Sequence, residues 1–288
     1  MVQLVECVPN FSEGRDASVV AALSGSIQSA LGGPVLDTSS DSDHHRSVIT
    51  FAGPAEAVLR AAVAAAGTAV ERIDLRRHQG VHPRIGAMDV LPFVPVSGIT
   101  LAECAGLAAA AGEEIWRRWH LPVYFYEAAA RSPERRNLAD VRRRPLGVPD
   151  IGGHELHPSA GAVAVGARKF LIAYNVNLRS ADLAVAKTIA RKIRTSSGGL
   201  GAVKALGVLL ASRGLVQVSM NLVDFETTPM HVALEAVRAE ATNLGVEVEE
   251  SELVGLVPRR AWELSQGHDL RIRGWDESRI LENRLRSS

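Results

Sequence analysis

The sequence predicts an α+β fold made of two related units, each with antiparallel strands covered by helices on one face. Two observations lead to this prediction. The order strand, helix, strand, strand, helix, strand occurs twice along the chain, the first time with an extra helix. The chain has 288 residues, which is long enough for two packed domains. We expect the first unit to span residues 1–178 and the second to span residues 179–288.

In the first unit, strands are expected where short apolar runs are bounded by Pro or polar residues. They cover residues 2–8, 35–38, 47–52, 88–94 and 122–126. Helices are expected over about residues 14–30, 55–73 and 101–119. Ser12 can cap the first helix, and Pro54 suits the first turn of the second. The polar residues 39–46 carry too many functional groups for a tight hairpin turn, so we expect a loop there.

The second unit follows a surface segment, residues 128–150, which is rich in Arg, Asn and Pro and contains a short helix. Its expected strands cover residues 170–175, 203–210, 215–223 and 246–256. Its expected helices cover residues 180–193, 229–244 and 258–265. The relation between the two units is inferred from the order of elements, because no residue-level repeat is visible.

Composition excludes several classes of protein. Lys plus Arg and Asp plus Glu both number 32, so no whole-chain field attracts nucleic acid or an anionic membrane. Cys7 and Cys104 fit neither a disulfide framework nor a zinc site, which favours a reducing cytoplasm. The N-terminus lacks the pattern of a signal peptide, and the most apolar region, residues 85–112, is interrupted by Asp, Glu and Pro. We therefore expect a soluble protein.

The densest cluster of unusual residues runs from His78 to Asp89 with the sequence HQGVHPRIGAMD, between a helix and a strand. Loops at such junctions often carry functional sites. Pro83 and Gly86 flank Arg84 and would hold it in a fixed relation to His82, which places a base beside an anion-binding group. The alternative is that His78 and His82 are hydrogen-bonded loop residues with a structural role.

A second cluster, residues 37–46, has the sequence DTSSDSDHHR. Its Asp and His residues match no recognised spacing of metal ligands, so a solvated acidic loop is the alternative to a site. Arg46 stands at the start of an apolar strand. A guanidinium group that enters a buried strand needs a carboxylate, from the protein or from a ligand.

Two further segments contain glycine beside polar residues. Residues 150–169 join the two units, and their glycines would allow a flat ligand to approach closely, although a flexible linker has the same composition. Residues 191–199 end a helix with Arg191, Lys192 and Arg194. These cations can complement the helix dipole, and Arg194 could equally hold a glutamate tail.

Five ordered motifs that together cover nearly the whole chain resemble the glutamate formiminotransferase family. They are VECVPNFSEG at residues 5–14, HPRIGAMD at 82–89, VGARKFLIAYN at 165–175, QVSMN at 217–221 and LVGLVP at 253–258. Members of that family transfer a formimino group from N-formiminoglutamate to N5 of tetrahydrofolate and release glutamate, in histidine degradation. The animal proteins fuse this domain to a cyclodeaminase.

The resemblance implies two ferredoxin-like βαββαβ subdomains with helices packed on the sheets, a folate tunnel between them, and a homodimer. Tetrahydrofolate is the cosubstrate it implies, with no metal. By position, His82 matches the family's catalytic histidine, and Arg46 matches an arginine that acts in the same site. The family's folate-contacting loop matches Gly152, Gly153, His154, Glu155, Leu156, His157, Pro158, Ser159, Ala160 and Gly161.

Three positions depart from the family pattern. Ser39 replaces an acidic residue, His45 stands where Asn is common, and Ala160 stands where a bulky aromatic residue occurs. The loss of a carboxylate at Ser39 could change the basicity of His82 or the donor accepted. Asp41 is a possible replacement for that carboxylate.

The chemistry of the transfer suits these residue types. In this hypothesis His82 accepts the proton of N5 and passes one to the departing amine. Arg46 and Arg84 hold substrate carboxylates, and Asp37, His45 and Arg194 also contact substrate. Two alternatives stay open: an enzyme of the same fold that uses 5-formyltetrahydrofolate or another formimino donor, and a non-catalytic folate-binding protein.

Overall fold

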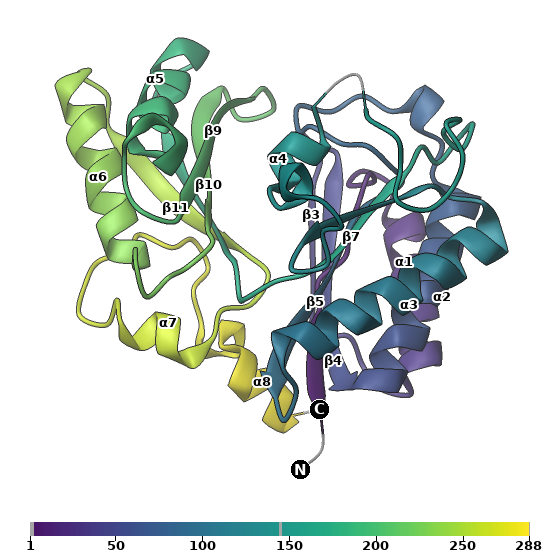
Figure 1. Ribbon diagram of the computed structural model, residues 1–288. Coiled ribbons are helices and arrows are strands. Elements are labelled where there is room, and N and C mark those ends of the chain that lie inside the picture. Colours follow the sequence, from purple (N-terminus) through teal and green to yellow (C-terminus); the bar gives the residue numbers. More distant parts are fainter. Residues whose placement is uncertain (1–2, 144–145, 288) are drawn as a thin grey trace. The chain divides into compact units, whose positions relative to one another are not determined.

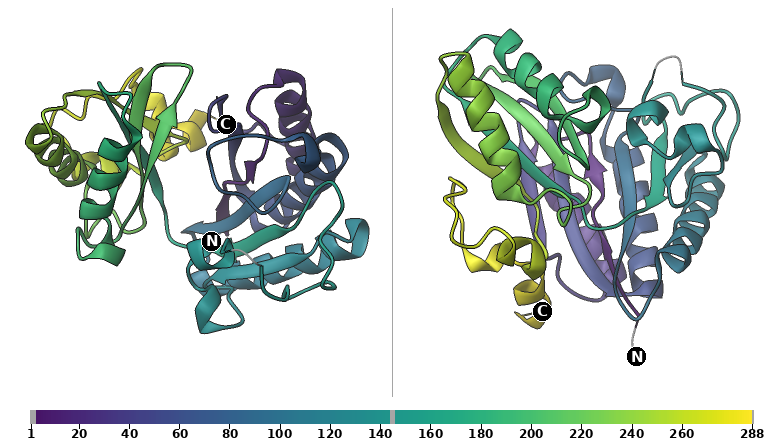
Figure 2. Two further views of the ribbon diagram at one scale, coloured as in Figure 1. Left: turned by 90° about the horizontal axis from the view of Figure 1, so that it is seen from above. Right: turned by 60° about the vertical axis from the view of Figure 1, so that its left-hand side comes forward.

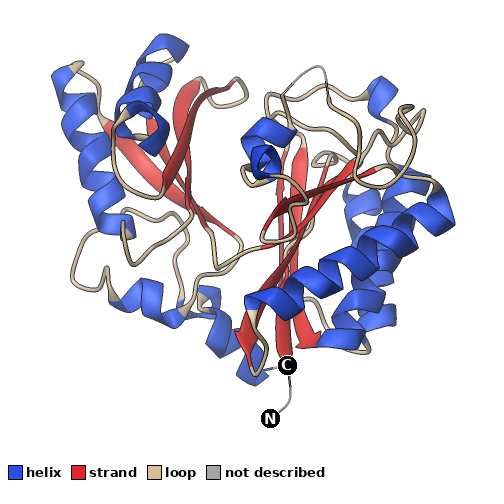
Figure 3. Cartoon of the chain, viewed as in Figure 1, coloured by secondary structure: helices blue, strands red, loops and turns tan. Residues whose placement is uncertain are grey.

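The computed structural model describes residues 3–143 and 146–287. Residues 1–2, 144–145 and 288 lie outside it; residue 2 belongs to the expected first strand, 144–145 to the surface segment and 288 to the second unit. The chain divides into two compact units, the first ending at Lys169 and the second beginning at Phe170. This division precedes the expected boundary after residue 178, because strand β8 (Ile172–Leu178) pairs with strands β10 and β11 of the second unit. Figure 3 distinguishes the strands and helices of both units.

The first unit has an extended βαββαβ order (Figure 1). Its strands are β1 (Leu4–Cys7), β2 (Asn10–Phe11), β3 (Asp37–Asp41), β4 (Arg46–Pro54), β5 (Met88–Ser97), β6 (Val123–Glu127) and β7 (Val163–Ala167). Its α-helices are α1 (Ala17–Leu31), α2 (Ala55–Arg72), α3 (Leu101–Trp119) and α4 (Leu138–Val141), and short 3-10 helices cover Leu75–Arg77 and Pro133–Arg135.

The topology of this sheet confirms the predicted fold class. Strands β3, β4, β1 and β5 lie side by side in that order and pair antiparallel, which is the arrangement of a ferredoxin-like βαββαβ unit. Beyond β5 the sheet continues with β7 and then β6, and these strands pair in parallel. The expectation of purely antiparallel sheets was therefore wrong for this unit. Strand β7 was missed because its small residues, VAVGA, read as part of a glycine-rich linker.

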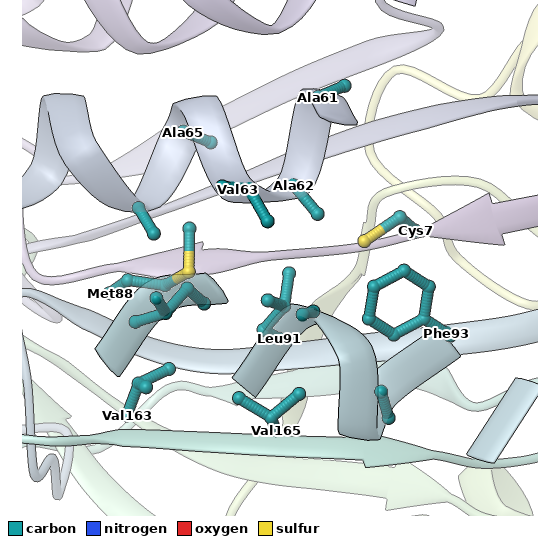
Figure 4. Close-up of a cluster of buried hydrophobic side chains, with 14 of the residues drawn as sticks. Cys7, Ala61, Ala62, Val63, Ala65, Met88, Leu91, Phe93, Val163 and Val165 are labelled. Atoms are coloured by element: carbon teal, nitrogen blue, oxygen red, sulfur yellow. The ribbon is translucent and has the colours of Figure 1, made fainter. Parts of the chain in front are cut away.

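Helices α1, α2 and α3 cover one face of the first sheet, and α4 lies on the other (Figure 1). Small residues of α2 such as Ala61, Ala62 and Ala65 bring this helix close to the sheet, where Leu91 and Phe93 of β5 are fully buried (Figure 4). Dense packing of this kind gives dispersion energy that larger gaps would lose. The helical face therefore forms the core and leaves the opposite face of the sheet for other groups.

Helix α1 begins at a residue that can satisfy its free N–H groups. Asp16, rather than the expected Ser12, caps α1, because its carboxylate accepts from the N–H groups of Ser18 and Val19. The Ser12 hydroxyl instead donates to the carbonyl of Gly86 at 2.7 Å. It therefore ties the N-terminal segment to the start of β5.

The second unit is a smaller ferredoxin-like fold. Its strands β8, β9 (Val203–Leu210), β10 (Leu215–Leu222) and β11 (Val248–Val254) form an antiparallel sheet in the order β11, β8, β10, β9. Its α-helices are α5 (Leu183–Ile193), α6 (Met230–Asn243), α7 (Arg259–Glu263) and α8 (Leu281–Ser287), and 3-10 helices cover Thr195–Ser197 and Glu277–Arg279. Helices α5 and α6 lie on the same side of the green strands (Figure 2). Their buried residues, among them Ile189 and Leu234, form a separate core.

Residues 39–46 differ from the expected loop. Residues Asp37–Asp41 form β3 and pair with β4, so that Asp41 stands opposite Arg46 and only residues 42–45 make the turn. Backbone pairing was possible because the polar side chains of β3 lie on a sheet edge. Among the described residues, no helix has the combined length and apolar character needed to cross a membrane.

Candidate active site

The face of the first sheet opposite helices α1 to α3 carries charged and polar side chains. Successive residues of a strand point to opposite faces. In β4, Ile49 belongs to the helical core, so Arg46 points to the other face. Asp41 and Ser39 lie on that same face, because they pair directly with Arg46 and Val48. The two sequence clusters thus contribute to one polar surface.

A buried cluster of charges lies at the centre of this surface. Nη1 of Arg46 donates to Oδ2 of Asp89 at 2.7 Å, and Nη2 of Arg142 donates to the same oxygen. The other donors of Arg46 reach Oδ1 of Asn10 at 3.1 and 2.9 Å. Oδ1 of Asp89 accepts from the N–H of Ile85 at 2.7 Å. The prediction that Arg46 needs a carboxylate is confirmed, and the protein supplies it.

The electrostatics of the cluster follow from this geometry. The side chain of Asp89 is fully buried, and those of Arg46 and Arg142 are 9% and 14% exposed. Burial alone would raise the pKa of Asp89, but the Arg142 and Arg46 guanidinium groups outweigh it and hold that pKa well below its usual range. The carboxylate is therefore ionised, and two guanidinium groups share its single charge.

His82 lies within electrostatic reach of this cluster. Its Nδ1 lies 2.8 Å from the carbonyl oxygen of Pro83, an atom that can only accept, so Nδ1 carries the proton and Nε2 keeps its lone pair. Burial lowers the pKa of His82 well below its usual value, and the positive charges of Arg46 and Arg142 lower it further. Near neutral pH the imidazole is uncharged, which is the state a proton acceptor requires.

Arg84 is held by backbone and ring groups of the segments around it. Its guanidinium donates to the backbone carbonyls of His82 at 2.7 Å, His44 at 3.1 Å and His45 at 3.2 Å, and also to the His78 ring at 2.9 Å. Burial, followed by the charge of Arg84, lowers the pKa of His78 to about 4, so this ring is neutral and can accept from Arg84. Arg84 thus fixes the His82 loop to the turn between β3 and β4.

His45 is held on both sides of its ring. Its Nδ1 lies 2.8 Å from the carbonyl oxygen of Gln79, and its Nε2 lies 3.1 Å from Oε1 of Glu13. The ring stacks on His78 with centroids 3.9 Å apart. The backbone of His45 has a φ of 47°, which the turn imposes. Both ring nitrogens therefore serve the loop structure.

The acidic strand β3 arranges its polar groups in pairs. The Ser39 hydroxyl donates to Oδ2 of Asp37 at 2.9 Å. Oδ1 of Asp41 accepts from the N–H of His44 at 2.7 Å and so caps the hairpin turn. Asp37, Ser39 and Asp41 alternate with Thr38 and Ser40, so the three share the face that carries Arg46.

The glycine-rich segment is attached to the His82 loop at one end. The N–H of Ala87 donates to the carbonyl of Ala160 at 2.9 Å, and the N–H of Ala162 donates to the carbonyl of Ile85 at 3.0 Å. Gly161 has a φ of 71°, and a Cβ atom there would lie 2.3 Å from the Ile85 oxygen. The side chain of Ala160 is fully buried, so the aromatic residue absent at this position would have no room in this arrangement.

The other end of the segment borders a recess at the end of α3. The cavity has a volume of about 550 Å³. The Trp116 ring meets the His120 ring edge to face at 5.2 Å. The recess is lined by Trp116, Trp119, His120, Gly153, His154, Glu155, Leu156, His157 and Pro158. Most of the expected folate-contacting residues therefore face a concave surface with aromatic walls, which suits a flat ligand.

Arg194 belongs to the second unit. It follows α5, and its Nε donates to the hydroxyl of Ser197 at 2.9 Å. Within the first unit, the structure brings together His82, Arg46, Arg84, His45 and residues 160–162 of the glycine-rich segment. Asp37 lies on the same face of the sheet as Arg46, and Arg194 belongs to the second unit.

The sequence interpretation missed Arg142, Asn10 and Glu13. Arg142 stands in an Arg-rich segment that reads as a solvated surface. A signal was present, because Asp89 is an acidic residue within the apolar start of a strand and such a residue needs cationic partners. No group of three or more His, Cys, Asp and Glu side chains in the described ranges is arranged to hold a metal ion.

Comparison with known proteins identifies the family of the chain. Residues 4–168 match the N-terminal subdomain of the formiminotransferase domain, and residues 173–270 match the formiminotransferase domain family. The chain is 41% identical to a glutamate formimidoyltransferase of Streptococcus pyogenes serotype M1, over 99% of both chains. It is also 41% identical to a glutamate formimidoyltransferase of Thermoplasma acidophilum, over 99% of this chain and 98% of that one. A formimidoyltransferase-cyclodeaminase of Rattus norvegicus is 42% identical over 91% of this chain, which spans 51% of that longer protein. The chain belongs to the formiminotransferase family.

Proposed function

We propose that the protein is a glutamate formimidoyltransferase, which moves the formimino group of N-formiminoglutamate to N5 of tetrahydrofolate. The observation that carries this proposal is the 41% identity to a glutamate formimidoyltransferase over 99% of both chains. The neutral imidazole beside a buried cationic cluster supports it, because the reaction needs a proton carrier and a binding group for an anionic donor.

The transfer is an exchange of nitrogen atoms at one carbon. The N5 lone pair attacks the amidinium carbon, and a tetrahedral adduct forms with the N5–C bond made. His82 accepts the N5 proton at Nε2 and delivers it to the glutamate nitrogen. The bond from carbon to that nitrogen then breaks, glutamate leaves as the amine, and the formimino group remains on N5. Protons balance within the site, and no covalent intermediate with the enzyme is needed.

The other side chains fall into two groups in this proposal. Arg46 faces the substrate and fixes its approach geometry, together with Asp37 on the same face of the sheet. Arg84 and His45 hold the loop that carries His82, because their polar groups contact backbone carbonyls and Glu13. We assign folate contacts to the segment from Gly152 to Gly161, supported by its aromatic recess. Contact between Arg194 and a glutamate tail remains part of the proposal.

The test is an incubation of the protein with tetrahydrofolate and N-formiminoglutamate, followed by detection of 5-formiminotetrahydrofolate and free glutamate. Equal amounts of both products support the proposal. Turnover of 5-formyltetrahydrofolate with no reaction of formiminoglutamate would instead identify the alternative enzyme of the same fold. Folate binding without turnover of either compound would identify a non-catalytic folate-binding protein.

We also propose that the protein is a homodimer, as the family resemblance implies, and that it acts in the cytoplasm, which its two isolated cysteines favour. Light scattering coupled to size-exclusion chromatography measures the mass in solution. A mass equal to that of one chain at micromolar concentration would contradict the dimer.

A further inference from the structure

The charge cluster on the open face of the first sheet is not neutral. Arg46 and Arg142 bring two positive charges, and Asp89 supplies one negative charge. All three side chains are largely buried, so water cannot compensate the excess positive charge as it does at an exposed surface. The cluster therefore favours a further anion beside the two guanidinium groups.

The two arginines differ in how many of their donors are used. Arg46 directs Nε and Nη2 to Asn10 and Nη1 to Asp89. Arg142 directs Nη2 to Asp89, whereas its Nε is buried and has no hydrogen-bond partner among the described residues. A buried donor without a partner costs free energy, and a ligand that accepts its hydrogen bond removes this cost. The open part of the cluster is thus the guanidinium edge of Arg142.

The position of Arg142 is fixed by the packing of the helix that precedes it. Helix α4 anchors it through Val141, which is 6% exposed and packs with Ile85 and Tyr126 in an apolar cluster of its own. The next residue, Arg143, turns outward, pairs with Asp140 and is 78% exposed. One arginine of this adjacent pair is therefore directed into the protein and the other into solvent.

The chemistry of the substrates identifies the anion. Asp89 accepts from Arg142 through Oδ2 and from the N–H of Ile85, three residues after His82, through Oδ1. Arg142 therefore lies beside the loop that carries His82, and its charge acts on the His82 imidazole. In N-formiminoglutamate the α-carboxylate is attached to the carbon that bears the formimino nitrogen. The glutamyl carboxylates of tetrahydrofolate are separated from N5 by the aminobenzoyl group. The donor's α-carboxylate is thus the substrate anion that necessarily lies near the reacting carbon, and it reaches Arg142 when that carbon reaches His82.

We propose that Arg142 binds the α-carboxylate of N-formiminoglutamate, and that Asp89 positions both Arg142 and Arg46 for this contact. The inference rests on the proposed function. A guanidinium group can bind a carboxylate through two parallel hydrogen bonds, which fixes its orientation as well as its distance. The donor would then present its amidinium carbon in a single orientation to N5.

The test combines a variant with a modified substrate. Arg142→Met should lower kcat/KM for N-formiminoglutamate by about 10- to 100-fold, in the range expected for hydrogen bonds to a charged group. The wild-type protein should lose a similar factor with N-formimino-4-aminobutyrate, which lacks the α-carboxylate. The variant should lose little more with that analogue, because the interaction is already absent. Equal losses by the variant with both donors would overturn the proposal.

Three controls distinguish the donor's α-carboxylate from a general effect of charge and from the folate tail. Arg143→Met should leave kcat/KM unchanged, and Arg142→Lys should restore part of the loss because it keeps the charge but not the fork of donors. Replacing tetrahydrofolate by tetrahydropteroate, which lacks the glutamyl group, should leave the effect of Arg142→Met intact. If the effect disappears, the folate tail is the bound anion and the proposal is wrong.

Titration calorimetry with L-glutamate provides a readout that does not depend on turnover. The wild-type protein should bind glutamate more tightly than the Arg142→Met variant, and circular dichroism should show that the variant is folded. If the wild-type protein does not transfer the formimino group at all, the proposed function fails, and the glutamate titration still decides the role of Arg142. Equal affinity of both proteins for glutamate would contradict that role.

Discussion

Arg46 and Arg142 donate to the same carboxylate oxygen, Oδ2 of Asp89, although Arg46 begins strand β4 and Arg142 follows helix α4, far away in the sequence. The shared oxygen brings β4, β5 and the segment after α4 to one point on the open face of the sheet. The same carboxylate accepts from the backbone of Ile85, three residues after His82 in the chain. The carboxylate of Asp89 therefore joins the cationic cluster to the His82 loop.

Removal of the negative charge of Asp89 should destabilise the protein. Asp89→Asn would leave two buried guanidinium groups without a counter-charge, so we expect the free energy of unfolding to fall by about 3–5 kcal/mol. Urea denaturation followed by circular dichroism measures it. Asp140→Asn, which changes an exposed pair with Arg143, should alter the stability by less than about 0.5 kcal/mol. Similar values for both variants would show that the cluster does not depend on its carboxylate.

Replacement of the base should affect turnover rather than folate binding. His82→Ala removes the proton carrier, and we expect kcat to fall by about 100-fold or more. The hydrogen bond of the His82 ring is made to its neighbour Pro83, so the loss of the ring leaves the Arg84 contacts in place. Steady-state kinetics and fluorescence titration with tetrahydrofolate measure the two effects. Unchanged turnover would remove His82 from the mechanism.

The pH dependence of the reaction should reveal how the cationic cluster changes the pKa of His82. The imidazole must be neutral to accept a proton, so kcat/KM should decline as the pH falls through the pKa of His82. Burial and the charges of Arg46 and Arg142 lower this pKa, so the wild-type decline lies at acidic pH, below the usual range of histidine. Arg142→Met removes a positive charge, raises the pKa and should move the decline to higher pH. Arg143→Met should leave the profile where it is, and a common profile for all three proteins would contradict this account.

The order of strands and helices could be predicted from the sequence because each element has a strong local pattern. Helix α3 spans the predicted residues 101–119, and β5 begins at the predicted Met88. Strand β7 could not be recognised in this way, since its residues are small and its neighbours along the sheet, β5 and β6, come from distant segments. Hydrophobic periodicity reports local burial and carries no information on which distant strands pair.

The site was predicted in part for a similar reason. His82 stands out in the sequence because it is a base directly before Pro83. Arg46 stands out because it is a cation at the start of an apolar strand. The function of Arg84 depends on which carbonyl groups surround it, and these belong to His44, His45 and His82. Arg142 looks like its exposed neighbour Arg143 in the sequence, and only the fold distinguishes an inward from an outward arginine.

The departure at Ser39 can be tested on the polar face of β3. Asp41 stands opposite Arg46, so we predict that it replaces the carboxylate that Ser39 lacks. Asp41→Asn keeps an acceptor for the His44 N–H and should still lower turnover strongly, because it removes a negative charge beside the site. Ser39→Asp should change turnover little or lower it, since its carboxylate would lie beside Asp37. Ser40→Ala, on the opposite face of the strand, is the control.

The opposite result would have a clear meaning. A large gain in turnover from Ser39→Asp, with no loss from Asp41→Asn, would contradict the replacement by Asp41. It would indicate that this protein acts on a natural donor different from N-formiminoglutamate. Both variants must therefore be measured with the same donor and at the same pH.

The contact between the glycine-rich segment and the His82 loop gives the last prediction. Gly161 has a φ of 71°, and a Cβ atom there would lie 2.3 Å from the Ile85 oxygen, so Gly161→Ala must separate the two segments or distort them. We expect a loss of stability of about 1–3 kcal/mol and a marked fall in kcat, because Ile85 follows His82 closely and also binds Asp89. Gly153→Ala is a matched control in the same segment, since no atom lies within 4 Å of the added Cβ. Because Gly153 also lies in the proposed folate-contacting segment, kcat is measured at saturating tetrahydrofolate, where weaker folate binding does not lower it. Urea denaturation and steady-state kinetics of the two variants decide the question. If Gly161→Ala is as stable and as active as Gly153→Ala, the glycine-rich segment does not hold the base in place.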